Sequence, residues 1–109
     1  MSSQINFDYM GTTYTLEFSR TTAVQTEKTF GVSINDLQTF RLTTFESLFH
    51  GALLLHHPRI KKSTVDKLLE LISDKPGLYS ELVTMFFETC ETALDDSANE
   101  GEAISWRKA

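Results

Sequence analysis

The fold is decided by the opening stretch Ile5-Asn6-Phe7-Asp8-Tyr9-Met10-Gly11-Thr12-Thr13-Tyr14-Thr15-Leu16-Glu17-Phe18. Apolar and polar side chains alternate on both sides of Gly11-Thr12, which predicts two half-buried strands. Because glycine supplies the positive φ of a type II′ turn, we expect a two-residue turn at Gly11-Thr12. The resulting register pairs Tyr9 with Tyr14, Phe7 with Leu16 and Ile5 with Phe18. All six apolar side chains then share one face, which helices or another chain must cover.

Helical patterns follow this hairpin. Ser19 can cap the first helix, and Gly31 fits its C-terminal stop. Pro58 ends the second helix, because the residue before a proline is disfavoured in the α region. We expect helices over about residues 19–30, 39–57, 63–73 and 78–95.

Two local signals set the boundaries of the later helices. Ser63–Asp66 resembles a capping box that opens the third helix, and Pro76-Gly77 breaks the chain before the last one. The sequence therefore predicts a single α+β domain, mainly α, over residues 1–109. It consists of a two-stranded antiparallel hairpin at 5–18, a helical part at 19–95 and a polar tail at 96–109 that we expect to be flexible.

Composition excludes several classes of protein. The chain has 109 residues, 40% of them hydrophobic, with 5 Gly and 2 Pro, so it can fill one core and is neither collagen-like nor globally disordered. Its longest apolar run, Ala52–Leu55, is far shorter than the roughly 20 residues that span a bilayer. The N-terminus lacks the pattern of a secretory signal, and the single Cys90 favours a reducing compartment.

The last predicted helix carries more apolar surface than one contact requires. Its apolar positions between Leu78 and Leu94 cover roughly 200° of the circumference, whereas packing on a small core takes a little over about 100°. One interpretation is a central helix contacted on two sides by its own chain. The other is an interface for a partner or a second copy near Val83, Phe87 and Leu94, with Leu54 as a further exposed apolar residue.

The histidines are the only plausible catalytic or metal-binding groups. Glu46 and His50 have i,i+4 spacing on one helix face, but a metal site needs at least one more ligand. His56 and His57 are adjacent and diverge by about 100° on a helix. There is no phosphate-binding loop, nucleophile elbow or paired-cysteine motif. We therefore expect no catalytic residue, cofactor or metal site, and a chain that is not an enzyme.

Charge is distributed unevenly along the chain. Residues 76–109 hold seven acids and two bases, which argues against general binding of nucleic acid. Residues 58–75 hold five bases and three acids. Most of these bases lie in the segment 59–67. Their charges leave open an alternative function, a small phage-encoded regulator that binds nucleic acid. An ordinary solvated face would explain the same charges. The bases concerned are Arg59, Lys61, Lys62 and Lys67.

Three features together resemble the tail assembly chaperones of long-tailed, siphovirus-type bacteriophages and prophages. They are the hairpin stretch Gly11–Phe18, the helix ending Leu48–Pro58, and the closing acidic helix with its polar tail. The resemblance spans nearly the whole chain. It carries over no individual functional residue.

The resemblance implies a noncatalytic role in virion morphogenesis. Proteins of this kind bind the long, hydrophobic tape-measure protein, keep it soluble, and promote polymerisation of tail-tube subunits around it. Many have a longer, frameshifted form that recruits the tail-tube protein. The resemblance also implies a homo-oligomer in the bacterial host cytoplasm that is absent from the mature virion, with no membrane as partner.

Overall fold

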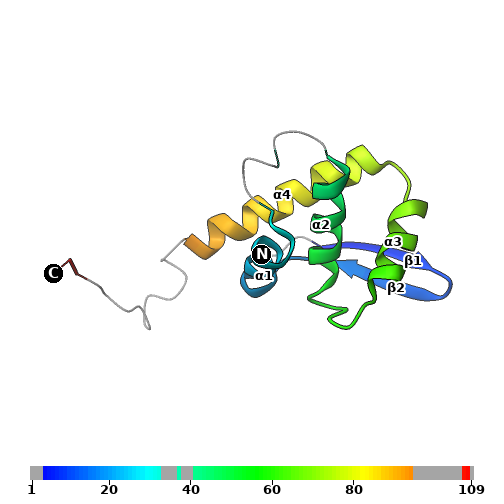
Figure 1. The fold of residues 1–109 in the computed structure, drawn as a ribbon, viewed down its shortest axis with the longest axis horizontal. Coiled ribbons are helices and arrows are strands. Elements are labelled where there is room, and N and C mark those ends of the chain that lie inside the picture. The colour runs from blue at the N-terminus through cyan, green and yellow to red at the C-terminus, as the bar shows by residue number, and fades with distance from the viewer. Residues whose placement is uncertain (1–3, 33–36, 38–40, 95–106, 109) are drawn as a thin grey trace.

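The computed structural model describes residues 4–32, 37, 41–94, 107 and 108. Two strands are followed by four helices, so the predicted α+β, mainly α, class is confirmed. Figure 1 shows their arrangement. The elements are β1 (Ile5–Tyr9), β2 (Thr12–Leu16), α1 (Arg20–Phe30), α2 (Leu42–Leu53), α3 (Lys62–Leu71) and α4 (Lys75–Leu94).

The hairpin forms with a different turn from the one predicted. Met10 (φ 48°) and Gly11 (φ 80°) both have positive φ, as a type I′ turn requires. The predicted Gly11-Thr12 turn is therefore wrong, and the register is shifted by two residues. Because side chains alternate with a period of two, the shift leaves every side chain on its predicted face. The observed partners on the apolar face are Ile5 with Leu16, Phe7 with Tyr14, and Tyr9 with Thr12.

Phe18 lies beyond the hairpin and does not pair with Ile5. Its side chain is 2% exposed and meets the Phe86 ring of α4 edge to face, with centroids 5.3 Å apart. The chain leaves β2 at Leu16, so the next apolar residue packs among the helices instead of extending the strand.

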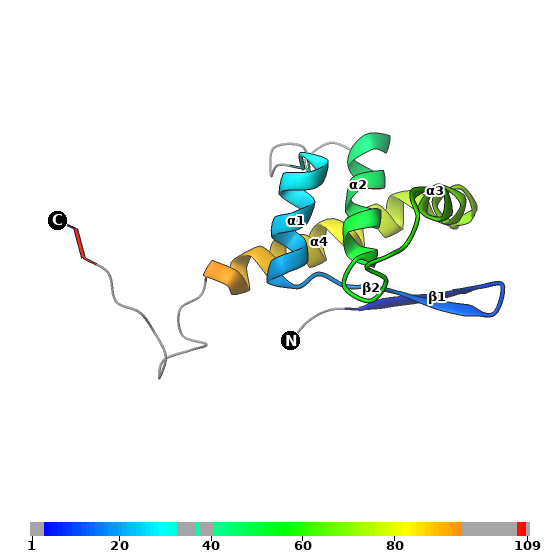
Figure 2. The same cartoon turned by 60° about the horizontal axis from the view of Figure 1, so that its bottom comes forward.

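Helix α2 is the centre of the molecule. It packs against α1, α3, α4 and β2, and Figure 2 shows the helices gathered on one side of the hairpin. Gly51 permits the close approach of α1, because a Cβ at this position would overlap the Thr26 side chain. The fully buried apolar side chains of α2 are Phe45, Leu48, Phe49, Ala52 and Leu53.

The predicted ends of α1 are confirmed. The Ser19 hydroxyl accepts from the Thr22 N–H (3.1 Å), and the Thr22 hydroxyl accepts from the Ser19 N–H (2.9 Å). Gly31 ends the helix in the left-handed region, with φ 69°. Together these contacts satisfy backbone groups that the helix itself leaves unpaired.

The predicted ends of α2 and α3 are partly wrong. Helix α2 ends at Leu53, and a turn follows in which the His57 N–H donates to the Leu53 carbonyl (2.8 Å). The chain therefore leaves the helix several residues before Pro58. Helix α3 has no side-chain cap, so the Ser63–Asp66 capping box is absent. Asp66 instead binds Lys62 one turn earlier, at 3.2 Å.

Pro76-Gly77 lies inside α4 and does not break the chain. Proline is tolerated in the first turn of a helix, where its missing N–H has no helical partner. The change of direction occurs before it, at Asp74 (φ 49°), whose carboxylate accepts from the Gly77 N–H at 3.3 Å. The predicted tail at 96–109 lies outside the described residues, apart from Arg107 and Lys108.

Candidate functional site

The predicted interface on α4 is only partly free. Tyr79, Leu82, Met85 and Phe86 are buried against the rest of the core. Val83 and Phe87 are half-buried and also pack against that core. Much of the wide apolar arc is therefore covered by α1 and α2, as one of the two interpretations expects.

The other two predicted interface residues do not extend this surface. Leu94 is the last residue of α4, and its side chain is outside the described part. Leu54 is half-buried in the turn after α2, where its N–H donates to the Gly51 carbonyl (3.3 Å). The structure thus brings together Val83 and Phe87, and it places Leu54 on a different element.

A groove between α2, α3 and the start of α4 offers a more open apolar surface. Its volume is about 330 Å³. Fully buried Phe45 forms the floor, half-buried Leu69 forms one wall, and Leu42 stands at the rim with 69% of its surface exposed. We call this surface the α2–α3–α4 groove. An apolar side chain so exposed beside an apolar floor can gain free energy by binding a partner.

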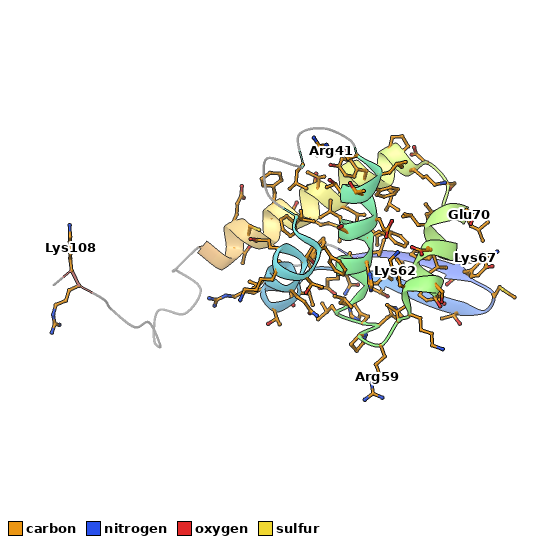
Figure 3. The ribbon with its side chains drawn as sticks, in the orientation of Figure 1. Arg41, Arg59, Lys62, Lys67, Glu70 and Lys108 are labelled. Carbon is orange, nitrogen blue, oxygen red and sulfur yellow. The ribbon has the colours of Figure 1, made fainter. Side chains whose placement is uncertain are left out.

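Acidic groups dominate the rim of the groove. Glu46, Asp66 and Glu70 line it together with Lys75. The Lys75 ammonium donates to the carbonyls of Glu70 (3.2 Å) and Ile72 (3.0 Å), so it closes the end of α3 instead of pairing with a carboxylate there. Figure 3 shows Glu70 on the outer side of α3. Lys75 and Lys62, which binds Glu46 and Asp66, offset part of this charge, so the rim keeps a small negative excess that disfavours an anionic ligand.

Lys62 connects two sides of this rim. Its ammonium lies 2.9 Å from the Glu46 carboxylate on α2 and 3.2 Å from the Asp66 carboxylate on α3. Hydrogen bonds to Glu46 and then Asp66 raise the pKa of Lys62 above its usual value. These exposed ion pairs contribute little to stability, and one of them links α3 to α2 beside the groove.

Leu42 is the residue that pattern reasoning missed. It precedes Phe45 by three positions and so continues the apolar stripe of α2. Periodicity assigns such a residue to the core. The stripe, however, reaches the first turn of the helix, beyond the neighbouring elements, and only the three-dimensional arrangement reveals the exposure.

Glu46 and His50, the two residues with i,i+4 spacing, have different partners in the structure. Glu46 binds Lys62, while the His50 ring lies tilted against the Phe30 ring with centroids 4.9 Å apart. Burial lowers the pKa of His50, and the charge of Lys62 lowers it further. Within the described residues no group of three or more His, Cys, Asp or Glu side chains could hold a metal ion. Burial also raises the pKa of the Cys90 thiol, which disfavours the reactive thiolate.

The basic segment does not form one continuous patch. All four of its predicted bases are exposed, but Lys62 is engaged by two carboxylates. Figure 3 shows Arg59 pointing away from the body at the bottom of the view and Lys67 lying beside α3. Phosphate binding gains from several free cations that follow one backbone, and this arrangement weakens that possibility.

His56 and His57 fasten the hairpin to the end of α2. The His57 Nε2 accepts the Thr15 N–H of β2 at 3.2 Å, and the Glu17 N–H donates to the Ala52 carbonyl at 2.9 Å. The His56 Nε2 lies 2.7 Å from the buried Glu17 carboxylate. The two adjacent histidines therefore serve one structural junction, and this role was not apparent from their spacing.

No helix in the described part of the chain is both long and apolar enough to cross a membrane.

Comparison with known proteins places the chain in a family. Neither the curated proteins nor the solved structures include a significant match. The family model of the domain of unknown function DUF5055 matches residues 1–109. Since that match spans the whole sequence, the chain belongs to the DUF5055 family.

Proposed function

We propose that this protein is a noncatalytic tail assembly chaperone of a long-tailed bacteriophage or prophage. In this role it binds the hydrophobic tape-measure protein in the host cytoplasm, keeps it soluble, and promotes tail-tube polymerisation around it. A longer, frameshifted form would recruit the tail-tube protein, and neither form would remain in the mature virion. The observation that carries the proposal is the open apolar α2–α3–α4 groove, together with the motif resemblance of Gly11–Phe18 and Leu48–Pro58.

The groove suits an apolar helix of the client. Exposed Leu42 and half-buried Leu69 come from two helices and offer apolar contacts above the buried Phe45, as in helix-in-groove recognition. Covering an exposed leucine contributes about 1.5–3 kcal/mol. The acidic rim would select client segments whose apolar face is flanked by lysine or arginine.

Coexpression with the tape-measure protein of the same phage tests the proposal. We expect the wild-type chain to increase the soluble fraction of the client and to copurify with it. Leu42→Asp should weaken the complex by at least about tenfold, because it places a charge in the apolar contact. An acidic residue in the first turn suits the helix dipole, so the variant should still fold.

Leu55→Asp is the matched control. Leu55 is an exposed leucine in the turn after α2, away from the groove lining, so its replacement should leave the complex intact. Client that stays insoluble with the wild-type chain, and yields no complex, would refute the chaperone function. A complex that tolerates Leu42→Asp would instead assign the client to another surface.

A further inference from the structure

The outer edges of the two strands differ in their hydrogen bonds to the rest of the chain. On β2, the Thr15 N–H is bound by His57 and the Glu17 N–H, directly after the strand, is bound by Ala52. Thr15 is paired with Asn6, so its outward N–H shows that this pair does not exchange hydrogen bonds within the hairpin. By the same alternation, the backbone groups of Asn6 and Asp8 point outward from the free edge of β1.

The outer edge of β1 has no partner among the described residues. Within the described part of the chain, no backbone hydrogen bond outside the hairpin engages Asn6 or Asp8. Figure 2 shows the hairpin below the helices, with its turn extending past α3. An unpaired strand edge of this kind is a template for another strand.

We propose that β1 pairs antiparallel with β1 of a second copy, about a twofold axis at Phe7. Each Asn6 then lies opposite Asp8 of the second copy, and the two residues exchange their outward N–H and C=O groups. The two hairpins become one four-stranded sheet. This inference does not depend on the identity of the client or on the chaperone function.

The register follows from which residues point outward. Only Asn6 and Asp8 can form the hydrogen-bonded pairs within β1, so three registers are available. Asp8 opposite Asp8 would place like charges together, which is unfavourable. Asn6 opposite Asn6 would leave Tyr9 beyond the paired region. Asn6 opposite Asp8 pairs the whole of Ile5–Tyr9 with the same strand of the second copy, and it avoids the repulsion between two Asp8 carboxylates.

Side chains on the polar face complement each other in this register. The Asn6 Oδ1 accepts from the Thr15 hydroxyl at 2.8 Å, which leaves the amide NH₂ free to donate. The Asp8 Oδ1 accepts from the Thr13 hydroxyl at 2.6 Å, and the carboxylate retains further acceptor capacity. The Asn6 amide can therefore donate to Asp8 of the second copy.

The same pairing would also cover part of the apolar face of the hairpin. Tyr9 lies opposite Ile5 of the second copy, beside a groove of about 80 Å³ lined by Phe7, Tyr9, Leu71 and other residues of β1 and α3. Leu71 is 53% exposed, so an apolar neighbour at this position would shield it. Both faces of the hairpin thus favour the same self-pairing.

Sedimentation velocity over a dilution series tests the interface. We expect a reversible dimer with micromolar affinity, because the paired region is small. Asn6→Asp should weaken dimerisation by about tenfold, since two symmetric pairs each gain a like-charge contact. Adding Asp8→Lys to Asn6→Asp restores opposite charges across the interface and should recover the wild-type affinity.

Proline substitutions provide a matched test of the backbone contacts. Asn6→Pro removes an outward N–H on β1 and should abolish the dimer, whereas Thr13→Pro removes an outward N–H on β2 and should not. Circular dichroism checks that both variants fold. A wild-type chain that stays monomeric at millimolar concentration overturns the proposal. A dimer that responds equally to the two prolines, or ignores Asn6→Asp, overturns it as well.

Discussion

At the scale of single residues, His57 couples the hairpin to the protonation state of one ring. The Nε2 that accepts the Thr15 N–H must be unprotonated, so only the neutral ring makes this bond. The Tyr14 ring covers it, with centroids 5.2 Å apart. Burial lowers the pKa of His57, and the adjacent His56 lowers it further. The native structure therefore favours the neutral form.

This lowered pKa gives stability a defined pH dependence. Below the usual histidine pKa of about 6.5 the unfolded chain binds the proton more readily than the native chain. The contribution of His57 to the free energy of unfolding is therefore at its maximum above that pH. It decreases as the pH drops toward the lower native pKa, and below that pKa it no longer changes. His57→Gln keeps an acceptor that does not titrate, so we expect it to lose less stability on acidification.

Urea unfolding at about pH 7.5 and 5.5 measures this difference. Every other residue is identical in the two proteins, so the comparison between wild type and variant isolates His57. An equal loss of stability in the two proteins would show that the His57 bond to Thr15 does not govern the response.

At the scale of elements, the turn of the hairpin holds Met10 in a strained backbone conformation that a substitution can relieve. Met10 has φ 48°, a left-handed conformation that costs an ordinary residue about 1–2 kcal/mol. Asparagine tolerates this region and is favoured in type I′ turns. We therefore expect Met10→Asn to raise the free energy of unfolding by about 0.5–1 kcal/mol, measured by urea denaturation.

Thr12→Asn is the control for this prediction. In the observed register Thr12 belongs to β2, where asparagine is disfavoured, so the variant should be neutral or destabilised. In the Gly11-Thr12 turn suggested by the sequence, the expectations would be reversed. Stabilisation by Thr12→Asn instead of Met10→Asn would thus contradict the observed turn.

The hairpin shows which features are readable from sequence. Alternation fixes the apolar face, but two turns one residue apart give the same faces, so the pattern alone does not decide between them. Ser19 and Gly31 mark α1 correctly, because their local chemistry is sufficient. Pro76 misleads, since proline both breaks and begins helices. Leu42 was missed because exposure depends on neighbours distant in the chain.

At the scale of the whole molecule, charge and apolar surface are combined on the groove. Its rim carries three carboxylates and Lys75, and Lys62 between α2 and α3 is paired with two of those carboxylates, so a small negative excess remains. Outside the groove, Arg59 and Lys67 point in separate directions (Figure 3). The formal net charge of -5 adds repulsion from any polyphosphate. The arrangement favours a basic, apolar protein segment over nucleic acid.

Reversing the free cations separates these two classes of partner. We expect the combined variant Arg59→Glu, Lys61→Glu and Lys67→Glu to retain the tape-measure complex within about twofold, because none of these residues lines the groove. We also expect the wild-type chain to show no DNA binding at about 50 mM salt, measured by fluorescence anisotropy. Salt-dependent binding that the triple variant loses would instead support the nucleic-acid regulator. Leu42→Asp is the converse variant, since it should weaken the client complex and leave any DNA binding unchanged.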